Sequence, residues 1–155
     1  MDLKTQVLMR DSLNTKNIMI YRIEKLLLED KVAFITGGGS GIGEATAKLF
    51  ASEGANVIIT DIDDVSGERV SNEIGSKATY LKCDVTNEED VLAVINEITK
   101  THSRIDCAVN NAGITGNPSN IEDTTYDNWF KVIHVNLTGV FFCLKHEITQ
   151  MIKQG

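Results

Sequence analysis

The sequence predicts an α/β fold in which a parallel sheet, truncated after about four strands, is doubly wound by helices. Two observations indicate this fold class. Four short apolar segments alternate with helix-like stretches between residues 30 and 155, and five glycines fall within seven residues after the first segment. Right-handed crossovers between successive strands then give parallel pairing, with helices on both faces of the sheet.

The strands are assigned to short apolar runs rich in β-branched and aromatic residues, which suit a pleated surface buried on both faces. They are expected at residues 32–35, 56–60, 78–83 and 105–109. Helices are expected at residues 42–52, about 65–74 and 88–100, with the longest one last, at about 126–153. Gly54 and Gly75 fall where helices should stop, and capping boxes that begin at Thr86 and Thr124 predict where two helices start.

An extension of 29 residues precedes the first predicted strand. Residues 17–28 have the apolar spacing of an amphipathic helix, and a poorly ordered leader is an equally good interpretation. The predicted organisation is therefore an extension over residues 1–29, followed by one partial domain over residues 30–155.

Composition excludes several classes of protein. The chain has 155 residues, of which 42% are hydrophobic and 24% charged, as is ordinary for a globular domain. Its formal net charge of −7 argues against a nucleic-acid-binding protein, which would carry a basic stripe. No apolar run approaches the roughly 18 residues of a membrane span. We therefore expect neither a nucleic acid nor a membrane as a partner.

The cysteines indicate a reducing, cytoplasmic setting. Cys83, Cys107 and Cys143 are far apart and odd in number, and no Cys-x-x-Cys pair occurs. The three histidines show no metal-ligand spacing with them. We expect buried free thiols and no metal site.

The glycine-rich stretch after the first strand favours anion binding. Glycines at residues 37–39, 41 and 43 let the backbone turn tightly and let a ligand approach without interference from Cβ atoms. From Ile42 the sequence favours a helix, whose unpaired N-terminal amides and positive dipole end face the loop. A Walker loop is excluded, because Glu44 and Ala45 stand where lysine and a hydroxyl residue are needed.

A carboxylate follows the second predicted strand. Asp61 lies 24 positions after Gly37, close to the spacing at which dinucleotide-binding folds place an acid that accepts hydrogen bonds from the adenosine ribose. The same charge would repel a 2′-phosphate, which predicts NAD in preference to NADP. The alternative is an acidic turn, since Asp63 and Asp64 are close by.

These motifs resemble one family. The order Thr36-Gly37-x-x-x-Gly41-x-Gly43 is similar to the Thr-Gly-x-x-x-Gly-x-Gly signature of the short-chain dehydrogenase/reductase family, and Asn110-Asn-Ala-Gly113 resembles its Asn-Asn-Ala-Gly motif. The resemblance covers about residues 30–155. It implies a Rossmann-like sheet and hydride transfer between a secondary alcohol or ketone and a nicotinamide cofactor. Within the family, the sequence looks like the NAD-using secondary-alcohol dehydrogenases.

The resemblance also assigns roles to individual residues. Asp84 and Val85 would contact the adenine, and Asn136 would be the catalytic asparagine that holds a water in the proton relay. From the residues alone, Asp84 could merely start a turn, and a lone helical asparagine is usually a surface residue or a kink. The expected cofactor-binding residues are Gly37, Ser40, Gly41, Ile42, Gly43, Asp61, Ile62, Asp84, Val85, Asn111, Ala112 and Gly113.

The family's other catalytic residues have no match in this sequence. In the family a serine and a Tyr-x-x-x-Lys follow a fifth strand, and the tyrosine acts as general acid and base. The one Tyr-x-x-x-Lys here, from Tyr21 to Lys25, precedes the first strand and so meets the wrong edge of the sheet. We therefore expect the cofactor-binding half of an enzyme, inactive alone. The strand at residues 105–109 would have an unpaired apolar edge, and the stability would be marginal.

Two other classes of function stay open. The chain could be a non-catalytic nucleotide-binding or oligomerisation module, since its last helix resembles the family's oligomer interface and would allow a homo-oligomer. It could also be a structural remnant that binds nothing. The substrate implied by the resemblance is a small-molecule alcohol or ketone.

Overall fold

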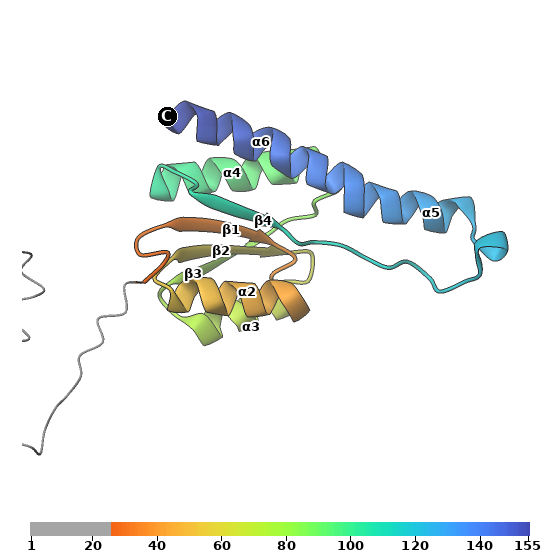
Figure 1. Ribbon diagram of the computed structural model, residues 1–155, viewed down its shortest axis with the longest axis horizontal. Helices are drawn as coiled ribbons and strands as arrows, with labels where there is room; N and C mark the ends of the chain where they lie inside the picture. The colour runs from red at the N-terminus through yellow and green to blue at the C-terminus, as the bar shows by residue number, and fades with distance from the viewer. Residues whose placement is uncertain (1–25) are drawn as a thin grey trace, which may run out of the picture.

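The structure is a computed structural model that describes residues 26–155, and it contains one parallel sheet of four strands (Figure 1). The strands are β1 (Val32–Thr36), β2 (Asn56–Asp61), β3 (Ala78–Lys82) and β4 (Cys107–Asn110). Their order in the sheet is β3-β2-β1-β4. Thr36 at the end of β1 pairs with Thr60 on one side and with Asn110 on the other, so the carboxyl ends of three strands meet at one edge. The predicted α/β class is confirmed.

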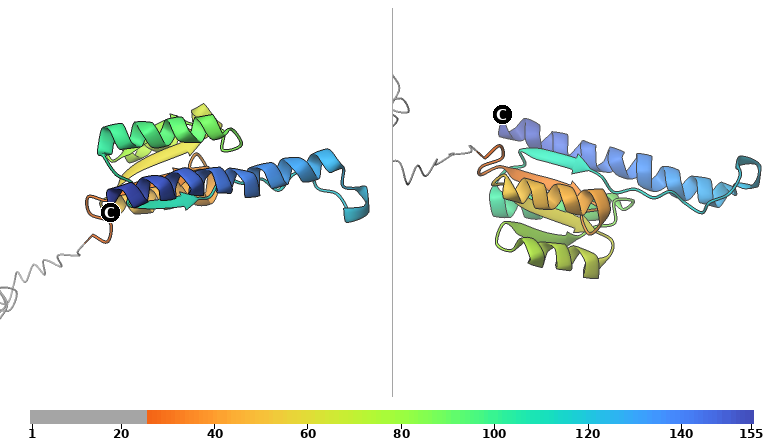
Figure 2. Two further views of the ribbon diagram at one scale, coloured as in Figure 1. Left: turned by 90° about the horizontal axis from the view of Figure 1, so that it is seen from above. Right: turned by 60° about the horizontal axis from the view of Figure 1, so that its bottom comes forward.

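Helices cover both faces of this sheet (Figures 1 and 2). On one face lie α2 (Gly41–Ser52) and α3 (Asp64–Ile74), and on the other lie α4 (Glu88–His102) and α6 (Val140–Gln154). This is the doubly wound arrangement that right-handed crossovers produce.

The central strand β1 is buried on both faces. All five of its residues are buried, and they alternate between the two halves of the core. Val32 and Phe34 pack in the cluster under α4 and α6, whereas Ala33 and Ile35 pack in the cluster with residues of α2 and α3. Burying one large side chain such as Phe34 or Ile35 contributes about 1.5–3 kcal/mol. The apolar run that predicts β1 therefore also contributes to the stability of both halves of the core.

The fourth strand begins later than predicted. It starts at Cys107 rather than at residue 105, because both backbone polar groups of Ile105 bond to the side chain of Gln154 in α6. Within residues 26–155, β4 pairs with β1 alone, so its other edge has no strand partner, as predicted. Two N-caps also differ from the prediction by one residue. Asn87 caps α4 and Thr125 caps the helix that follows, and neither predicted capping box begins at the cap.

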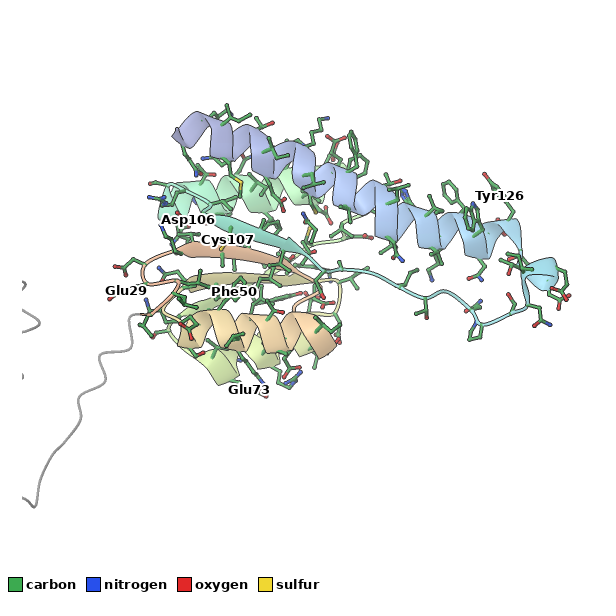
Figure 3. All side chains as sticks on the ribbon, in the orientation of Figure 1. Glu29, Phe50, Glu73, Asp106, Cys107 and Tyr126 are labelled. Atoms are coloured by element: carbon green, nitrogen blue, oxygen red, sulfur yellow. The ribbon has the colours of Figure 1, made fainter. Side chains whose placement is uncertain are left out.

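The last predicted helix is continuous but not uniform. It consists of α5 (Tyr126–Ile133), a π-helical segment (His134–Gly139) and α6. A Cβ atom on Gly139 would lie 2.8 Å from the Cγ2 atom of Val85, so the glycine allows the helix to approach the segment that follows β3 closely. Beyond this point α5 extends past the sheet, and Tyr126 at its start lies far from the core (Figures 2 and 3).

The segment before β1 forms a turn. The backbone N–H of Leu28 donates to the carbonyl of Glu53 at the end of α2, and Leu28 packs on the core. The helix expected over residues 17–28 lies almost entirely outside the described residues, as do Tyr21 and Lys25, and its last three positions are not helical here. No helix among residues 26–155 has the length and apolar character needed to cross a membrane.

The packing of α3 on β3 gives a first testable prediction. A Cβ on Gly67 would lie 2.1 Å from a ring carbon of Tyr80, whose hydroxyl is fixed by hydrogen bonds to Asp61 and Asp64. Gly67→Ala should lower the free energy of unfolding by about 1–2 kcal/mol, because overpacking exceeds the gain in helix propensity. Urea titration would measure it. The control Asn72→Ala, at an exposed position of α3, should raise stability by about 0.5 kcal/mol, and equal effects of the two variants would contradict this packing.

Candidate functional site

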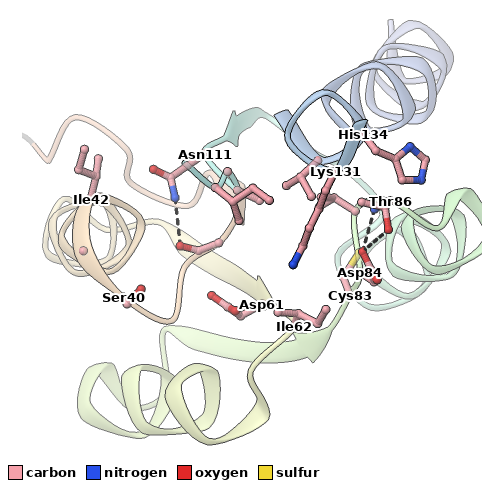
Figure 4. Close-up of a pocket in the computed structure, with 17 residues that line it drawn as sticks. Ser40, Ile42, Asp61, Ile62, Cys83, Asp84, Thr86, Asn111, Lys131 and His134 are labelled. Carbon is pink, nitrogen blue, oxygen red and sulfur yellow. Dashed lines mark hydrogen bonds between the residues drawn. The ribbon is translucent and has the colours of Figure 1, made fainter. Parts of the chain in front are cut away.

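A cleft of about 680 Å³ lies at the carboxyl ends of the strands (Figure 4). Its volume is within the range of small-molecule and cofactor sites. Eleven of the twelve residues predicted to bind the cofactor line it, namely Gly37, Ser40, Gly41, Ile42, Asp61, Ile62, Asp84, Val85, Asn111, Ala112 and Gly113. Gly43 lies directly behind the loop, and Asn136 does not line the cleft.

The glycine loop forms one wall of the cleft. Gly37 and Gly41 have φ values of 64° and 54°, in the left-handed region that favours glycine. A Cβ on Gly43 would lie 2.1 Å from the carbonyl oxygen of Gly37, so the first turn of α2 packs directly on the loop. Ser40 is the N-cap of α2, and its side chain makes no capping hydrogen bond. The first amides of α2 therefore stand at the cleft as donors for an anion.

Glu44 does not oppose an anion in the cleft. Its carboxylate accepts hydrogen bonds from Arg69, at 2.7 Å, and from Lys48, at 2.6 Å. These two cations hold the pKa of Glu44 at about 2, well below the usual range. The guanidinium of Arg69 also donates to the carbonyl oxygen of Gly39. The charge of Glu44 is thus compensated on the α3 side of the loop, away from the cleft.

The ends of β1 and β4 are tied together beneath the cleft. The hydroxyl oxygen of Thr36 accepts hydrogen bonds from the backbone N–H groups of Asn111 and Ala112, each at 3.1 Å. The side-chain amide of Asn111 donates in return to the carbonyl oxygens of Thr36 and Gly37. The side chain of Asn111 therefore holds the glycine loop in place, and its Nδ2 atom already donates to two protein carbonyls.

Asp61 connects the end of β2 to the glycine loop. One carboxylate oxygen accepts from the backbone N–H of Gly39 at 3.0 Å, and the other accepts from the backbone N–H of Asp63 at 3.1 Å. Each carboxylate oxygen has a second lone pair, so both can accept a further hydrogen bond from a ligand. The acid and the helix amides line the same cleft, as the sequence predicts.

Asp84 and Val85 close the opposite end of the cleft. Asp84 accepts from both the backbone N–H and the hydroxyl of Thr86, which is the turn-forming role considered as the alternative to adenine binding. It also lines the cleft, so the turn and a ligand contact are compatible. Val85 is 8% exposed, because Gly139 of the last helix packs closely against it.

Asn136 lies in the π-helical segment, and both ends of its side-chain amide are engaged. Its oxygen accepts from the backbone N–H of Ile114 and its nitrogen donates to the carbonyl of Ile114, each at 2.8 Å. This pairing joins the helix to the loop after β4. A π segment often marks a functional position. The catalytic role of Asn136 stays a prediction, and the observed contact is one that positions the loop.

Sequence reasoning missed the side of the cleft formed by the helix. Lys131, His134 and Val135 line the cleft, and Lys131 extends its ammonium group toward the middle (Figure 4). Their spacing places them on one helical face, directly before Asn136. This spacing identifies the three residues as cleft-lining only when it is known that the helix crosses the ends of the strands. Cys83, Thr86 and Ile114 complete the lining, and residues 26–155 contain no cluster of three or more possible metal ligands.

Comparison with known proteins identifies the family. A family model described as short chain dehydrogenase matches residues 31–155. The chain belongs to the short-chain dehydrogenase family. It is 47% identical over 127 residues to secoisolariciresinol dehydrogenase of Forsythia intermedia, covering 81% of this chain and 46% of that protein. It is 42% identical over 136 residues to the short chain dehydrogenase/reductase astE of Aspergillus oryzae, covering 85% and 52%. This chain therefore spans about half the length of these curated short-chain dehydrogenases.

A solved structure supports the same assignment. The crystal structure of a 3-ketoacyl-(acyl-carrier-protein) reductase from Brucella melitensis complexed with NADH superimposes with a TM-score of 0.77 at 41% identity. The match covers 79% of this chain and 51% of that one. The four-stranded sheet described above is thus a short-chain dehydrogenase sheet, and the family supports a nicotinamide cofactor.

The contact between β1 and β4 gives the second prediction. Thr36→Val keeps the shape of the side chain and removes the oxygen that accepts two backbone N–H groups. The free energy of unfolding should fall by about 1–3 kcal/mol, because the part-buried N–H group of Ala112 loses its partner and that of Asn111 keeps only the carbonyl of Val109. Thr60→Val is the control, since Thr60 is equally buried and pairs with Thr36 across the sheet, but makes a single long hydrogen bond of 3.4 Å. Urea unfolding should show less than about 1 kcal/mol for this control, and equal losses would contradict the prediction.

Proposed function

We propose that this chain forms the NAD-binding part of an oxidoreductase that transfers hydride between a secondary alcohol or ketone and nicotinamide. The observation that carries the proposal is the position of Asp61, which lines the same cleft as the amides of α2 and binds the glycine loop. A pyrophosphate on those amides and a ribose on that carboxylate are the two contacts that a dinucleotide needs. When bound, the nicotinamide ring supplies the hydride chemistry.

The charges around Asp61 support NAD over NADP. A 2′-phosphate would face the carboxylate of Asp61, which already accepts the backbone N–H of Gly39. Arg69 is the cation that contacts the glycine loop, and its guanidinium is engaged by Glu44, Glu73 and the carbonyl of Gly39. It therefore offers less charge to a phosphate than a free arginine would. The Brucella relative was crystallised with NADH, which agrees with this proposal.

The relatives support the proposed type of substrate. Their names describe a dehydrogenase and a ketoacyl reductase, which agrees with a reaction that interconverts an alcohol and a carbonyl group. In the proposed reaction the alcohol carbon gives a hydride to NAD⁺ and the hydroxyl proton is released to solvent, so that a ketone, NADH and H⁺ are formed. We propose that the residues around the cleft of this chain bind and orient the cofactor. Catalytic turnover is proposed for a protein of the full length of the relatives.

We also propose that the chain forms a homo-oligomer through an exposed apolar stripe on the last helix. The stripe consists of Tyr126, Phe130, Leu137, Phe141, Leu144, Ile148 and Ile152, each between 43% and 74% exposed. Spacings of three, four and seven residues place them on one side, as at the seam between paired helices. A second copy fits because twofold pairing places the stripe against itself. The same surface would serve the alternative function, a non-catalytic oligomerisation module.

A cytoplasmic location is the last part of the proposal. Cys83, Cys107 and Cys143 are all free thiols in the structure; Cys83 and Cys143 are buried, as predicted, whereas Cys107 is only partly buried. Burial raises the pKa of both Cys83 and Cys143 to about 12, so neither forms a reactive thiolate at neutral pH. Inert, buried free thiols are typical of a reducing compartment.

Cofactor preference provides the third prediction. Asp61→Asn should lower the affinity for NADH about tenfold or more and narrow the preference for NADH over NADPH, because charge-assisted hydrogen bonds of about 1.5–3 kcal/mol weaken and the repulsion of a 2′-phosphate is lost. Isothermal titration calorimetry with both cofactors would measure this.

The matched control is Asp63→Asn, which makes the same charge change two positions later while keeping a good N-cap for α3. It should leave both affinities within about twofold of the parent chain. Failure of the parent chain to bind NADH would overturn the proposed function. Equal effects of the two substitutions would overturn only the role of Asp61.

The fourth prediction tests the stripe. Phe141→Glu should shift the chain toward the monomer in sedimentation-velocity experiments, since a charge at the centre of an apolar interface is costly to bury. Leu49→Glu is the control, because Leu49 has the same exposure of 58% but lies on α2, outside the stripe. A parent chain that sediments as a monomer at all concentrations, or a control that dissociates equally, would contradict the proposal.

A further inference from the structure

Glu147 is a buried acid that the cleft does not use. It lies on α6 with 2% of its surface exposed. Among residues 26–155 it is the only residue with an ionisable acidic or basic side chain of the Asp, Glu, Lys or Arg type that is buried. Its single hydrogen bond comes from the side-chain amide nitrogen of Asn110, at the end of β4, which donates to Oε2 at 3.0 Å. This bond joins α6 to the sheet.

The same two side chains leave two oxygens unpaired. Oε1 of Glu147 and Oδ1 of Asn110 are both fully buried, and neither has a hydrogen-bond partner. Both atoms are acceptors when the glutamate is ionised, so neither can satisfy the other. One proton on Oε1 would change this, because a carboxylic acid and an amide can exchange two hydrogen bonds side by side.

The surroundings favour the neutral form. The face of α4 that packs here carries Val91, Val94, Ile95 and Ile98, and the titratable group that faces Glu147 on α6 is the buried thiol of Cys143. The neighbouring side chains of Lys145 and His146 bind Glu88 of α4 instead. Burial raises the pKa of Glu147, and the hydrogen bond from Asn110 offsets this in part. An ionised carboxylate in such a place would be desolvated and weakly compensated.

We propose that Glu147 is held as a neutral carboxylic acid whose Oε1–H group donates to Oδ1 of Asn110, which closes a ring of two hydrogen bonds between α6 and β4. The ring satisfies both orphaned oxygens with one proton. Asn110 directly precedes Asn111, which holds the glycine loop, so the ring makes Glu147 a positioning residue for that end of the sheet.

The test compares Glu147→Gln with the parent chain. A glutamine amide can donate to Oδ1 and accept from Nδ2 of Asn110 at every pH, so this variant keeps the ring without a titrating group. In the unfolded chain Glu147 has its ordinary pKa of 4.5. Below that pH both states are protonated. As the pH rises from 4.5 to the raised pKa of the folded state, the unfolded state loses its proton first, and the folding constant of the parent falls tenfold per pH unit.

Urea unfolding between pH 4.5 and 8 should therefore show Glu147→Gln gaining stability over the parent as the pH rises, with at least a tenfold advantage in folding constant at pH 7. Glu68→Gln, at an exposed position of α3, makes the same chemical change and should show no such divergence. Parallel pH profiles for Glu147→Gln and the parent, or a less stable variant at pH 7, would overturn the proposal. The experiment contains no cofactor and so does not depend on the proposed function.

A second measurement needs no comparison of stabilities. Carbon-13 NMR of the parent chain labelled at glutamate carboxyl groups should show one protonated carboxyl signal at pH 7, which is lost in Glu147→Gln. If all glutamate signals are those of carboxylates at pH 7, the ring does not exist and the proposal fails.

Discussion

Four hydrogen bonds between the end of β1 and the segment that follows β4 hold the two sides of the cleft in register. They place the side chain of Asn111 under the glycine loop, where its amide meets the carbonyls of Thr36 and Gly37. Because Gly43 packs on that same carbonyl of Gly37, the start of α2 is fixed by the same contacts. The orientation of the first amides of α2, on which the proposed anion site relies, depends on this junction between the ends of β1 and β4 and the start of α2.

Asp61 shows how a single side chain can serve both the fold and the ligand. Its bond to the backbone N–H of Gly39 sets the distance between the end of β2 and the loop. Its remaining lone pairs and its charge stay available to the cleft, and in the proposed function they accept from ribose hydroxyls and repel an added phosphate. The ion pairs of Arg69 with Glu44 and Glu73 support the same proposal, because they compensate the charge of a cation beside the glycine loop.

The parts of the fold that the sequence predicts are those decided locally. The glycines around Gly41 and the acid at Asp61 are set by backbone conformation and strand ends, and nearly all the predicted cofactor residues line the cleft. The errors arise where distant segments meet. The start of β4 depends on Gln154, about fifty residues away, and the π segment around Asn136 depends on a pairing with Ile114. Lys131 lines the cleft only because its helix crosses the strand ends, which no local pattern encodes.

The side chain of Gln154 acts as a substitute for a neighbouring strand at Ile105. It accepts from the backbone N–H at 2.8 Å and donates to the carbonyl at 2.9 Å, as a peptide group of a sheet would. The last turn of a helix opens more often than its interior. The amide hydrogen of Ile105 therefore exchanges with solvent when that turn frays, although the residue is nearly fully buried. The entry to β4 and the final turn of α6 thus form one unit of local unfolding.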